Sequence, residues 1–444
     1  MAKVDLAVVP KIYLGILLNQ GGFTPLGLTL LQELAQRGAH IIALSPESIS
    51  SPRVDIIIEL LRSTTSNENI FAEHCDLSSP SSIRGFCSRF LTTEDNRLDG
   101  IVFAHEYAHI GSPLPTKSTA LEDEMERQTR SLATFLITTL LLPILLVAPA
   151  ERDIRIVNVI NPFYAAAVTN FFPTTEALPE KPSIFLQEGR RSLQMAILTR
   201  HLQRILDSMP QHSQAPQVDG EVVNVVPSKL QRSNVVAIAV SPGITKTDTI
   251  APLLAADREN PLRFTLIGVI LSVLFLLSWR FTEIGSRYFL LRPLLWLLTK
   301  SPTPGIQTVL HALFLPTPFK SEASNKAKGD ELTVEVLKPG ALYADCSVVR
   351  VTPRANPSKQ TPSKDGQGKA GKEKGKQRDS PEDNSGTLPD DGEMGGELLG
   401  RQVWENFEAA LRAWEKSNPA TELTGTEGGK EKAGQGGHPI SVKS

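Results

Sequence analysis

The chain has 444 residues, of which 41% are hydrophobic and 21% are charged, and its formal net charge is −2. This composition allows one large buried core and an additional tail, and the near-neutral charge gives no basic field that would favour nucleic acid as a partner. The three cysteines are far apart in the sequence, so they predict neither a disulfide framework nor a metal site and favour a reduced, cytosol-facing protein.

The stretch from Ile12 to Ala39 predicts the opening unit of a dinucleotide-binding sheet. An apolar run at 12–18 is followed by a turn that contains Gly21 and by apolar residues at helical spacing up to Ala35. A second apolar run, 40–44, follows at once. This order of strand, turn, helix and strand is typical of the first half of a doubly wound parallel sheet.

The glycine turn of this unit is incomplete. In a working turn one glycine makes the bend, a second lets the pyrophosphate approach the backbone, and a third lets the helix and strand pack closely. The first and third positions fit Gly21 and Gly27, but the middle position is Pro25, which has a ring and no N–H. We therefore expect the fold to be kept and the binding of a dinucleotide to be disfavoured.

Strands and helices continue to alternate through the middle of the chain. A short strand ends at Asp76, whose carboxylate would either bond an adenine amine or cap the following helix. Residues 132–150 carry no charge and would form a helix of about 28 Å, which is long enough to be a membrane span or a buried central helix. The strand that follows favours the buried helix. The remaining elements are predicted as helices at 56–61 and 189–209, a helix that begins near 79–82, a charged helical face that starts at 122–130, and strands at 98–105, 155–160 and 235–243.

Several local phrases occur in an order that resembles the short-chain dehydrogenase/reductase superfamily, particularly its retinol-dehydrogenase-like branch. They are QELAQRGA, HCDL, LDGIVFAH, FLITTLLLPILL, RIVNV, ILTRHLQRIL, VSPGITKTD and PLLWLLTKSPTPGIQT, and they extend over about residues 10–350. The resemblance implies an α/β fold with a Rossmann-type doubly wound parallel sheet. It also implies NAD(P) as the cofactor and a lipophilic alcohol or ketone as the substrate.

The catalytic residues implied by the resemblance are replaced in this chain. The family's tyrosine and lysine, four residues apart, correspond to Glu188 and Ser192, and none of the five tyrosines is followed by lysine at that spacing. The family's serine corresponds to Asn161, and its supporting asparagine corresponds to Arg130. The tyrosine serves as general acid or base, and the lysine lowers its pKa and holds the cofactor ribose. Glutamate and serine cannot reproduce that pair.

The positions that the resemblance assigns to the cofactor are only partly kept. The asparagine-alanine-glycine turn beneath the cofactor becomes 104–106, which places the carboxylate of Glu106 where a glycine is usual. The polar cluster formed by His105, Glu106, Tyr107 and His109 would be either a polar loop or a substituted active site, and its spacing matches no metal motif. The residues that remain as vestigial cofactor positions are Gly21, Gly27, Asp76, Pro242, Gly243 and Thr247.

An apolar insertion at 262–300 predicts contact with a membrane. Residues 264–279 carry no charge, and a second apolar block lies at 288–298, with arginine, lysine, tryptophan and tyrosine at the borders. A hairpin or a pair of helices embedded in one leaflet fits this pattern, so we expect 264–298 to bind a membrane or lipid surface. The alternatives are an apolar substrate lid and a dimer surface.

The C-terminal part divides into a linker and a helix. Residues 353–397 are rich in proline, glycine, serine and charge, and predict a disordered linker. Residues 398–418 predict an amphipathic helix whose Trp404 and Phe407 dock on the body of the protein.

Two functions follow from these observations. The leading hypothesis is a catalytically degenerate protein of short-chain dehydrogenase ancestry that binds or scaffolds protein partners. It would lie on an intracellular membrane, such as the endoplasmic reticulum, a lipid droplet or the mitochondrial outer surface, with its domain facing the cytosol. The alternative is an NAD(P)-dependent oxidoreductase that acts on a lipophilic ketone or alcohol through a non-standard active site.

Overall fold

The computed structural model describes residues 16–17, 24–93, 97–111, 117–149, 152–169, 171, 183–209, 234–253, 299–317, 335–353 and 392–418. Three features expected from the sequence lie outside the described residues. They are Gly21, the apolar insertion at 264–298 and most of the linker at 353–397.

The described strands form a parallel arrangement with a switch point. One group contains β1 (Ile16–Leu17), β2 (Ile41–Ser45) and β3 (Ile70–His74), and the other contains β4 (Gly100–Phe103), β5 (Ile154–Val159), β6 (Val235–Ser241), β7 (Leu342–Ala344) and β8 (Ser347–Val349). Only β7 and β8 pair antiparallel among these strands. Because β1 lies next to β4, the spatial order runs β3, β2, β1, β4, β5, β6, β7, β8. In such a fold ligands bind where the order reverses, here between β1 and β4.

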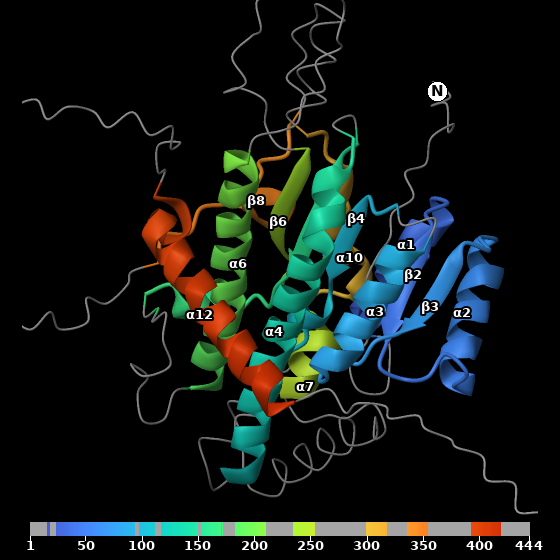
Figure 1. The fold of residues 1–444 in the computed structure, drawn as a ribbon, viewed down its shortest axis with the longest axis horizontal. Coiled ribbons are helices and arrows are strands. Elements are labelled where there is room, and N and C mark those ends of the chain that lie inside the picture. Colours follow the sequence, from blue (N-terminus) through green and yellow to red (C-terminus); the bar gives the residue numbers. More distant parts are fainter. Residues whose placement is uncertain are drawn as a thin grey trace, which may run out of the picture.

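Helices cover both faces of the strands (Figure 1). One face packs against α1 (Pro25–Gln36), α2 (Pro52–Thr65) and α10 (Pro302–Phe314), and the other against α3 (Pro80–Thr92), α4 (Lys117–Val147) and α6 (Ile184–Ser208). The fold is therefore an α/β Rossmann-type sandwich, as predicted. The shorter elements are η1 (His105–Tyr107), α5 (Tyr164–Ala167), η4 (Lys246–Ile250), α7 (Ala251–Leu253) and η5 (Glu393–Gly395), and the last helix is α12 (Gly396–Ser417).

Helix α4 is the most apolar long helix in the described part of the chain. Its stretch Ala120–Val147 is long and apolar enough to cross a membrane, and 61% of the most apolar window is buried inside the protein. The side chains of Ala133, Leu136 and Leu141 belong to the core between the strands and α3. This burial supports the interpretation of residues 132–150 as a core helix.

Helix α6 begins earlier than the sequence predicted. It starts at Ile184, with the Ser183 hydroxyl accepting the backbone N–H of Leu186, whereas the apolar spacing predicted a start at Gly189. Glu188 and Ser192 consequently lie within the first turns of a long helix that packs on β6.

Helix α12 lies across α4 and α6, as Figure 1 shows in red. Its Val403 and Phe407 are buried, and the Trp404 ring meets the Phe135 ring edge-on at a centroid distance of 4.9 Å. The docking of Trp404 and Phe407 agrees with the prediction. Residues 392–397, at the end of the stretch expected to be disordered, form η5 and the first residues of α12.

We expect Phe407→Ala to lower the free energy of unfolding by about 3 kcal/mol, because it removes a buried ring from the contact with Phe135. The matched control is Leu398→Ala on the same helix, whose side chain is 73% exposed and whose removal is expected to change little. Urea unfolding of both variants measures the difference. Equal losses would contradict a docked α12.

Candidate functional site

The structure brings the described cofactor positions together at the carboxyl ends of the strands. Gly27 lies in the first turn of α1, Pro242 and Gly243 follow β6, and Thr247 lies in η4. Helix α1 contacts η4, and a Cβ placed on Gly305 of α10 would lie 3.2 Å from the Leu26 side chain and 3.4 Å from the Thr245 side chain. These residues thus come from the elements that border a dinucleotide in Rossmann-type folds.

At the N-terminus of α1, a side chain of the same segment caps one backbone N–H group, and a proline removes another. The Thr24 hydroxyl accepts the backbone N–H of Gly27 at 3.1 Å, and Pro25 occupies the first helical position without an N–H. Backbone N–H groups at such a helix end are what bind a pyrophosphate. Two of those N–H groups are therefore engaged or missing here.

Asp76 lies in a turn between β3 and α3. Its carboxylate accepts the backbone N–H and the hydroxyl of Ser78 at 2.9 and 2.8 Å, and its own N–H donates to the Ser82 hydroxyl. Ser79 is the residue that caps α3. The carboxylate thus supports the local turn, while contact with an adenine stays a prediction.

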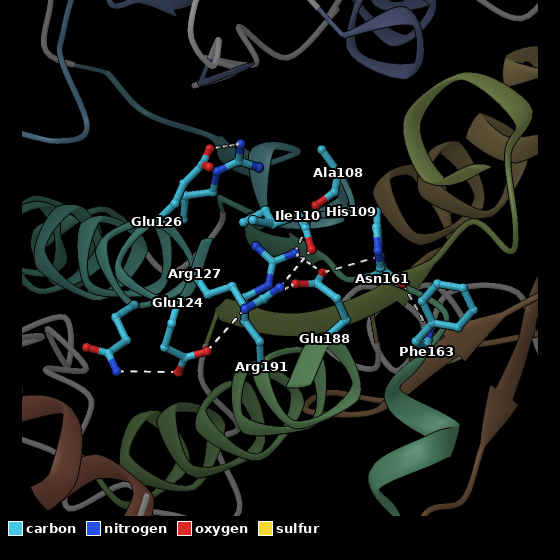
Figure 2. A network of polar contacts seen from close by, with 12 residues as sticks. Ala108, His109, Ile110, Glu124, Glu126, Arg127, Asn161, Phe163, Glu188 and Arg191 are labelled. Atoms are coloured by element: carbon cyan, nitrogen blue, oxygen red, sulfur yellow. Dashed lines mark hydrogen bonds and ion pairs between the residues drawn. The ribbon is translucent and has the colours of Figure 1, made fainter. Parts of the chain in front are cut away.

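Glu188, which the resemblance matches to the family's tyrosine, is fully buried and ion-paired. Its carboxylate lies 2.6 Å from the Arg127 Nε and 2.9 Å from the Arg191 Nη2. Figure 2 shows the two guanidinium groups on one side of Glu188 and the His109 imidazole on the other. The Nδ1 of His109 is 3.8 Å from the Glu188 carboxylate. Ser192 is buried one turn further along α6, and its hydroxyl has no hydrogen-bond partner among the described residues.

A second buried carboxylate, that of Glu106, joins the same network. It accepts hydrogen bonds from the Thr134 hydroxyl at 3.0 Å and from the Ser131 hydroxyl at 3.3 Å, and it lies 3.4 Å from the Arg191 Nη1. Arg191 also donates to the backbone carbonyls of Glu106 and Ala108. One arginine therefore binds both carboxylates and fixes the loop after β4 to α6.

Arg130 and Asn161, the other two family positions, hold the same loop. Arg130 donates to the His105 carbonyl and pairs with Glu126 on its own helix. The Asn161 amide donates to the Tyr107 carbonyl at 3.1 Å, and its carbonyl oxygen accepts the Phe163 N–H. Both side chains are buried in structural contacts.

The pKa values of the two carboxyl groups shift in opposite directions. Burial raises the pKa of Glu106, and the opposing attraction of Arg191 does not cancel this effect. For Glu188, burial is again the largest influence, but Arg191, His109 and Arg127 together outweigh it and hold the pKa below its ordinary value. Glu188 is consequently a fixed anion, and it carries no proton to donate at neutral pH.

Burial keeps the two histidines of this region neutral. It lowers the pKa of His105 to about 3 and that of His109 to about 4. The His105 Nε2 lies 2.9 Å from the Thr134 hydroxyl, while the backbone N–H of His109 donates to the Asp248 carbonyl. His109 thus belongs to the contact between the loop after β4 and η4.

Tyr107 links the loop that follows β4 to the loop that follows β6. Its hydroxyl donates to the Gly243 carbonyl at 2.7 Å and accepts the Thr245 N–H at 3.1 Å. The ring is buried in the core that contains α1 and α10, and burial raises the pKa of the hydroxyl. These contacts join the two loops directly.

The described residues do not fit NAD(P). A dinucleotide would lie across the carboxyl ends of the strands, from the N-terminus of α1 to the loop after β6. In this structure Pro25 stands at the first of these places, and the Tyr107 hydroxyl is bonded to the Gly243 carbonyl at the second.

The sequence pointed to part of this site. It identified the cluster from His105 to His109 and the positions Arg130, Asn161 and Glu188. It missed Arg127 and Arg191, which hold both carboxylates. The available signal was the placement of Arg191 three residues after Glu188, since that spacing puts the two side chains on one face of a helix.

We expect Arg191→Met to lower the free energy of unfolding by about 3 to 5 kcal/mol, because it leaves Glu106 and Glu188 short of a partner in the protein interior. The control is Arg401→Met, which removes a pair with Glu397 on the exposed side of α12 and is expected to cost less than about 1 kcal/mol. Urea unfolding compares the two. A similar small loss in both would contradict the network's structural role.

We expect the protein to become less stable as the pH decreases, because His109 stays neutral in the folded state and becomes protonated in the unfolded state. Its folded pKa of about 4 lies below the unfolded value of about 6.5, so the unfolded chain binds more protons within this window. Between pH 7 and pH 5 this difference lowers the free energy of unfolding by about 2 kcal/mol. Urea unfolding at both pH values should show a smaller loss in His109→Gln than in the unsubstituted chain. An identical pH dependence would contradict a neutral buried His109.

Comparisons with known proteins give two fungal relatives. An uncharacterized oxidoreductase of Saccharomyces cerevisiae is 27% identical over 299 residues, which cover 66% of this chain and 65% of the relative. An uncharacterized oxidoreductase of Schizosaccharomyces pombe is 25% identical over 306 residues, which cover 68% of this chain and 70% of the relative. The match with the Saccharomyces protein thus spans just under two thirds of that protein's length. No protein-family model matches the chain.

Solved structures of short-chain dehydrogenases give weaker matches. L-sorbose reductase from Gluconobacter frateurii is 14% identical, with a TM-score of 0.36 and coverage of 55% of this chain and 73% of that protein. RhlG from Pseudomonas aeruginosa is 17% identical, with a TM-score of 0.37 and coverage of 57% and 80%. TM-scores this low give no evidence about the fold beyond the strand order described above. None of the relatives named here supports the narrower resemblance to retinol dehydrogenases. The Rossmann-type strand order agrees with the fold that the ordered sequence motifs implied, and both fungal relatives are described as oxidoreductases.

Proposed function

We propose that this protein is a catalytically degenerate short-chain dehydrogenase-like protein that acts by binding other molecules. The observation that carries the proposal is the Glu188 carboxylate, buried between Arg127 and Arg191 where the family has its tyrosine. A general acid has to carry a proton and reach its substrate. Glu188 meets neither condition, because its pKa is lowered and its side chain is fully buried.

The neighbouring contacts support the same proposal. Ser192, at the position of the family's lysine, has no amine that could lower the pKa of an acid or hold a ribose. The Tyr107 hydroxyl and the His109 N–H bond the loop after β4 to the Gly243 carbonyl and to the Asp248 carbonyl. These buried hydrogen bonds hold the two loops together, and separating the loops would cost free energy for each group left unpaired.

The proposed site of action is an intracellular membrane. The support is the sequence of the insertion at 264–298, with its apolar blocks and its basic and aromatic borders. The insertion would bind a lipid surface while the Rossmann-type domain faces the cytosol and binds or scaffolds protein partners. The endoplasmic reticulum, lipid droplets and the mitochondrial outer surface all meet this description.

The second candidate is an NAD(P)-dependent oxidoreductase acting on a lipophilic ketone or alcohol. The description of both fungal relatives as oxidoreductases favours it. The Nδ1 of His109 lies 3.8 Å from Glu188, so these two residues would be its acid and base. This candidate requires the loops held by Tyr107 to open.

We expect no change in melting temperature when NADPH or NADH is added up to millimolar concentration to the folded, detergent-solubilised protein. Binding at 100 times the dissociation constant would add about 2.7 kcal/mol, which is a shift of several degrees. Cooperative unfolding of the same sample without cofactor is the control for a folded protein.

A saturable rise in melting temperature would contradict the degenerate-site proposal. The oxidoreductase candidate would then require NADPH consumption with a lipophilic ketone in the unsubstituted chain. It would also require that Glu188→Gln abolish this turnover while the cofactor-induced rise remains.

A further inference from the structure

Helix α12 covers an apolar face of α4 and α6 and is joined to the body through a long connection. The residues on either side of that connection meet, since the Met394 N–H donates to the Val351 carbonyl at 2.9 Å. From there α12 runs over the core with Leu399, Val403 and Phe407 buried. Because residues 354–391 connect it to the body, α12 could leave this face and stay tethered.

A histidine of α6 lies directly beneath this helix. A side-chain carbon placed on Gly400 would lie only 2.8 Å from the His201 Nδ1 and 3.1 Å from its Cβ, so α12 approaches the imidazole as closely as a glycine allows. The Trp404 ring stands 5.8 Å from the same imidazole, centroid to centroid. His201 is therefore part of the contact between the two helices.

The contact suits a neutral imidazole. The His201 Nδ1 is buried and has no hydrogen-bond partner among the described residues. Across the contact it faces Gly400, which has no side chain to accept a hydrogen bond from it. Protonation would place a buried N–H at this nitrogen without an acceptor, which is unfavourable.

The charged groups around His201 also disfavour a cation there. Arg204 on α6 and Arg401 on α12 repel it, while Glu397 on α12 attracts it but lies 3.3 Å from Arg401. Burial is the largest influence, and with the two arginines it lowers the pKa of His201. Of the adjoining charged residues, Arg200 donates to the Pro339 carbonyl, and Glu393 of η5 pairs with Lys338 and Arg350. Helix α4 contributes the apolar Phe135, whose ring packs against Trp404, and adds no charge there.

We propose that α12 is a pH-sensitive cover, whose docking on the apolar face of α4 and α6 weakens when His201 becomes protonated. A released α12 exposes His201 to water, where its pKa returns to about 6.5. The released state therefore binds more protons than the docked state below this pH, and docking weakens as the pH falls. From pH 7.5 to pH 5.5 the docking equilibrium constant falls by up to about tenfold.

Tryptophan fluorescence tests this proposal in the full chain. The chain has four tryptophans, and the double substitution Trp279→Phe and Trp296→Phe leaves Trp404 and Trp414, both on α12. In this background we expect a red shift of the emission between pH 7.5 and pH 5.5 that reverses on neutralisation. His201→Gln keeps a neutral polar side chain and should remove the shift. Gly400→Ala should show the red-shifted emission already at pH 7.5.

A shift of equal size in His201→Gln, or no shift in the His201 chain, would overturn the proposal. Hydrogen exchange of peptides from 396–417 gives the same comparison in the unsubstituted chain, with peptides of α3 as the reference for the intrinsic effect of pH. Loss of protection in α12 alone at pH 5.5 supports the release of this helix. Loss in α3 to the same degree indicates general unfolding and contradicts the proposal.

Discussion

The buried ion pairs of Glu188 with Arg127 and Arg191 are the constraint on which the candidate site depends. Charges in a protein interior persist only when they are paired and hydrogen-bonded, so each member of this set requires the others. Through Arg191 the pairing extends to Glu106 and to the carbonyls of the loop after β4. Glu188 and its two arginines thus fix two helices and a loop to one another.

The same loop links the site to the rest of the fold. Tyr107 and His109 bond it to the segment after β6, and the Asn161 amide holds it from the end of β5. These contacts join the ends of three neighbouring strands at the edge of the sheet where ligands bind in α/β proteins. Several polar side chains at this edge, among them Tyr107, Asn161 and Arg191, bond to neighbouring loops and helices, so they stabilise the fold whether or not a ligand binds there.

Local patterns predicted most of the fold because helices and strands have different apolar periods. The run that ends at Leu44 and the spacing through Leu34 are examples, and both elements formed as expected. The start of α6 was predicted too late because Glu188 and the two following arginines look like solvent-facing residues, whereas the structure buries them. Pairing across α4 and α6 depends on tertiary packing, which no local pattern encodes.

The position of α12 also has a consequence during synthesis. About 190 residues separate the end of α6 from α12, and at 5–20 residues per second their translation takes roughly 10 to 40 s. Throughout that interval the nascent chain contains α4 and α6 but not the helix that shields Phe135 from water. Folding of this protein on the ribosome thus leaves an apolar surface open for many seconds, and chaperone binding to that surface is the expected protection against aggregation.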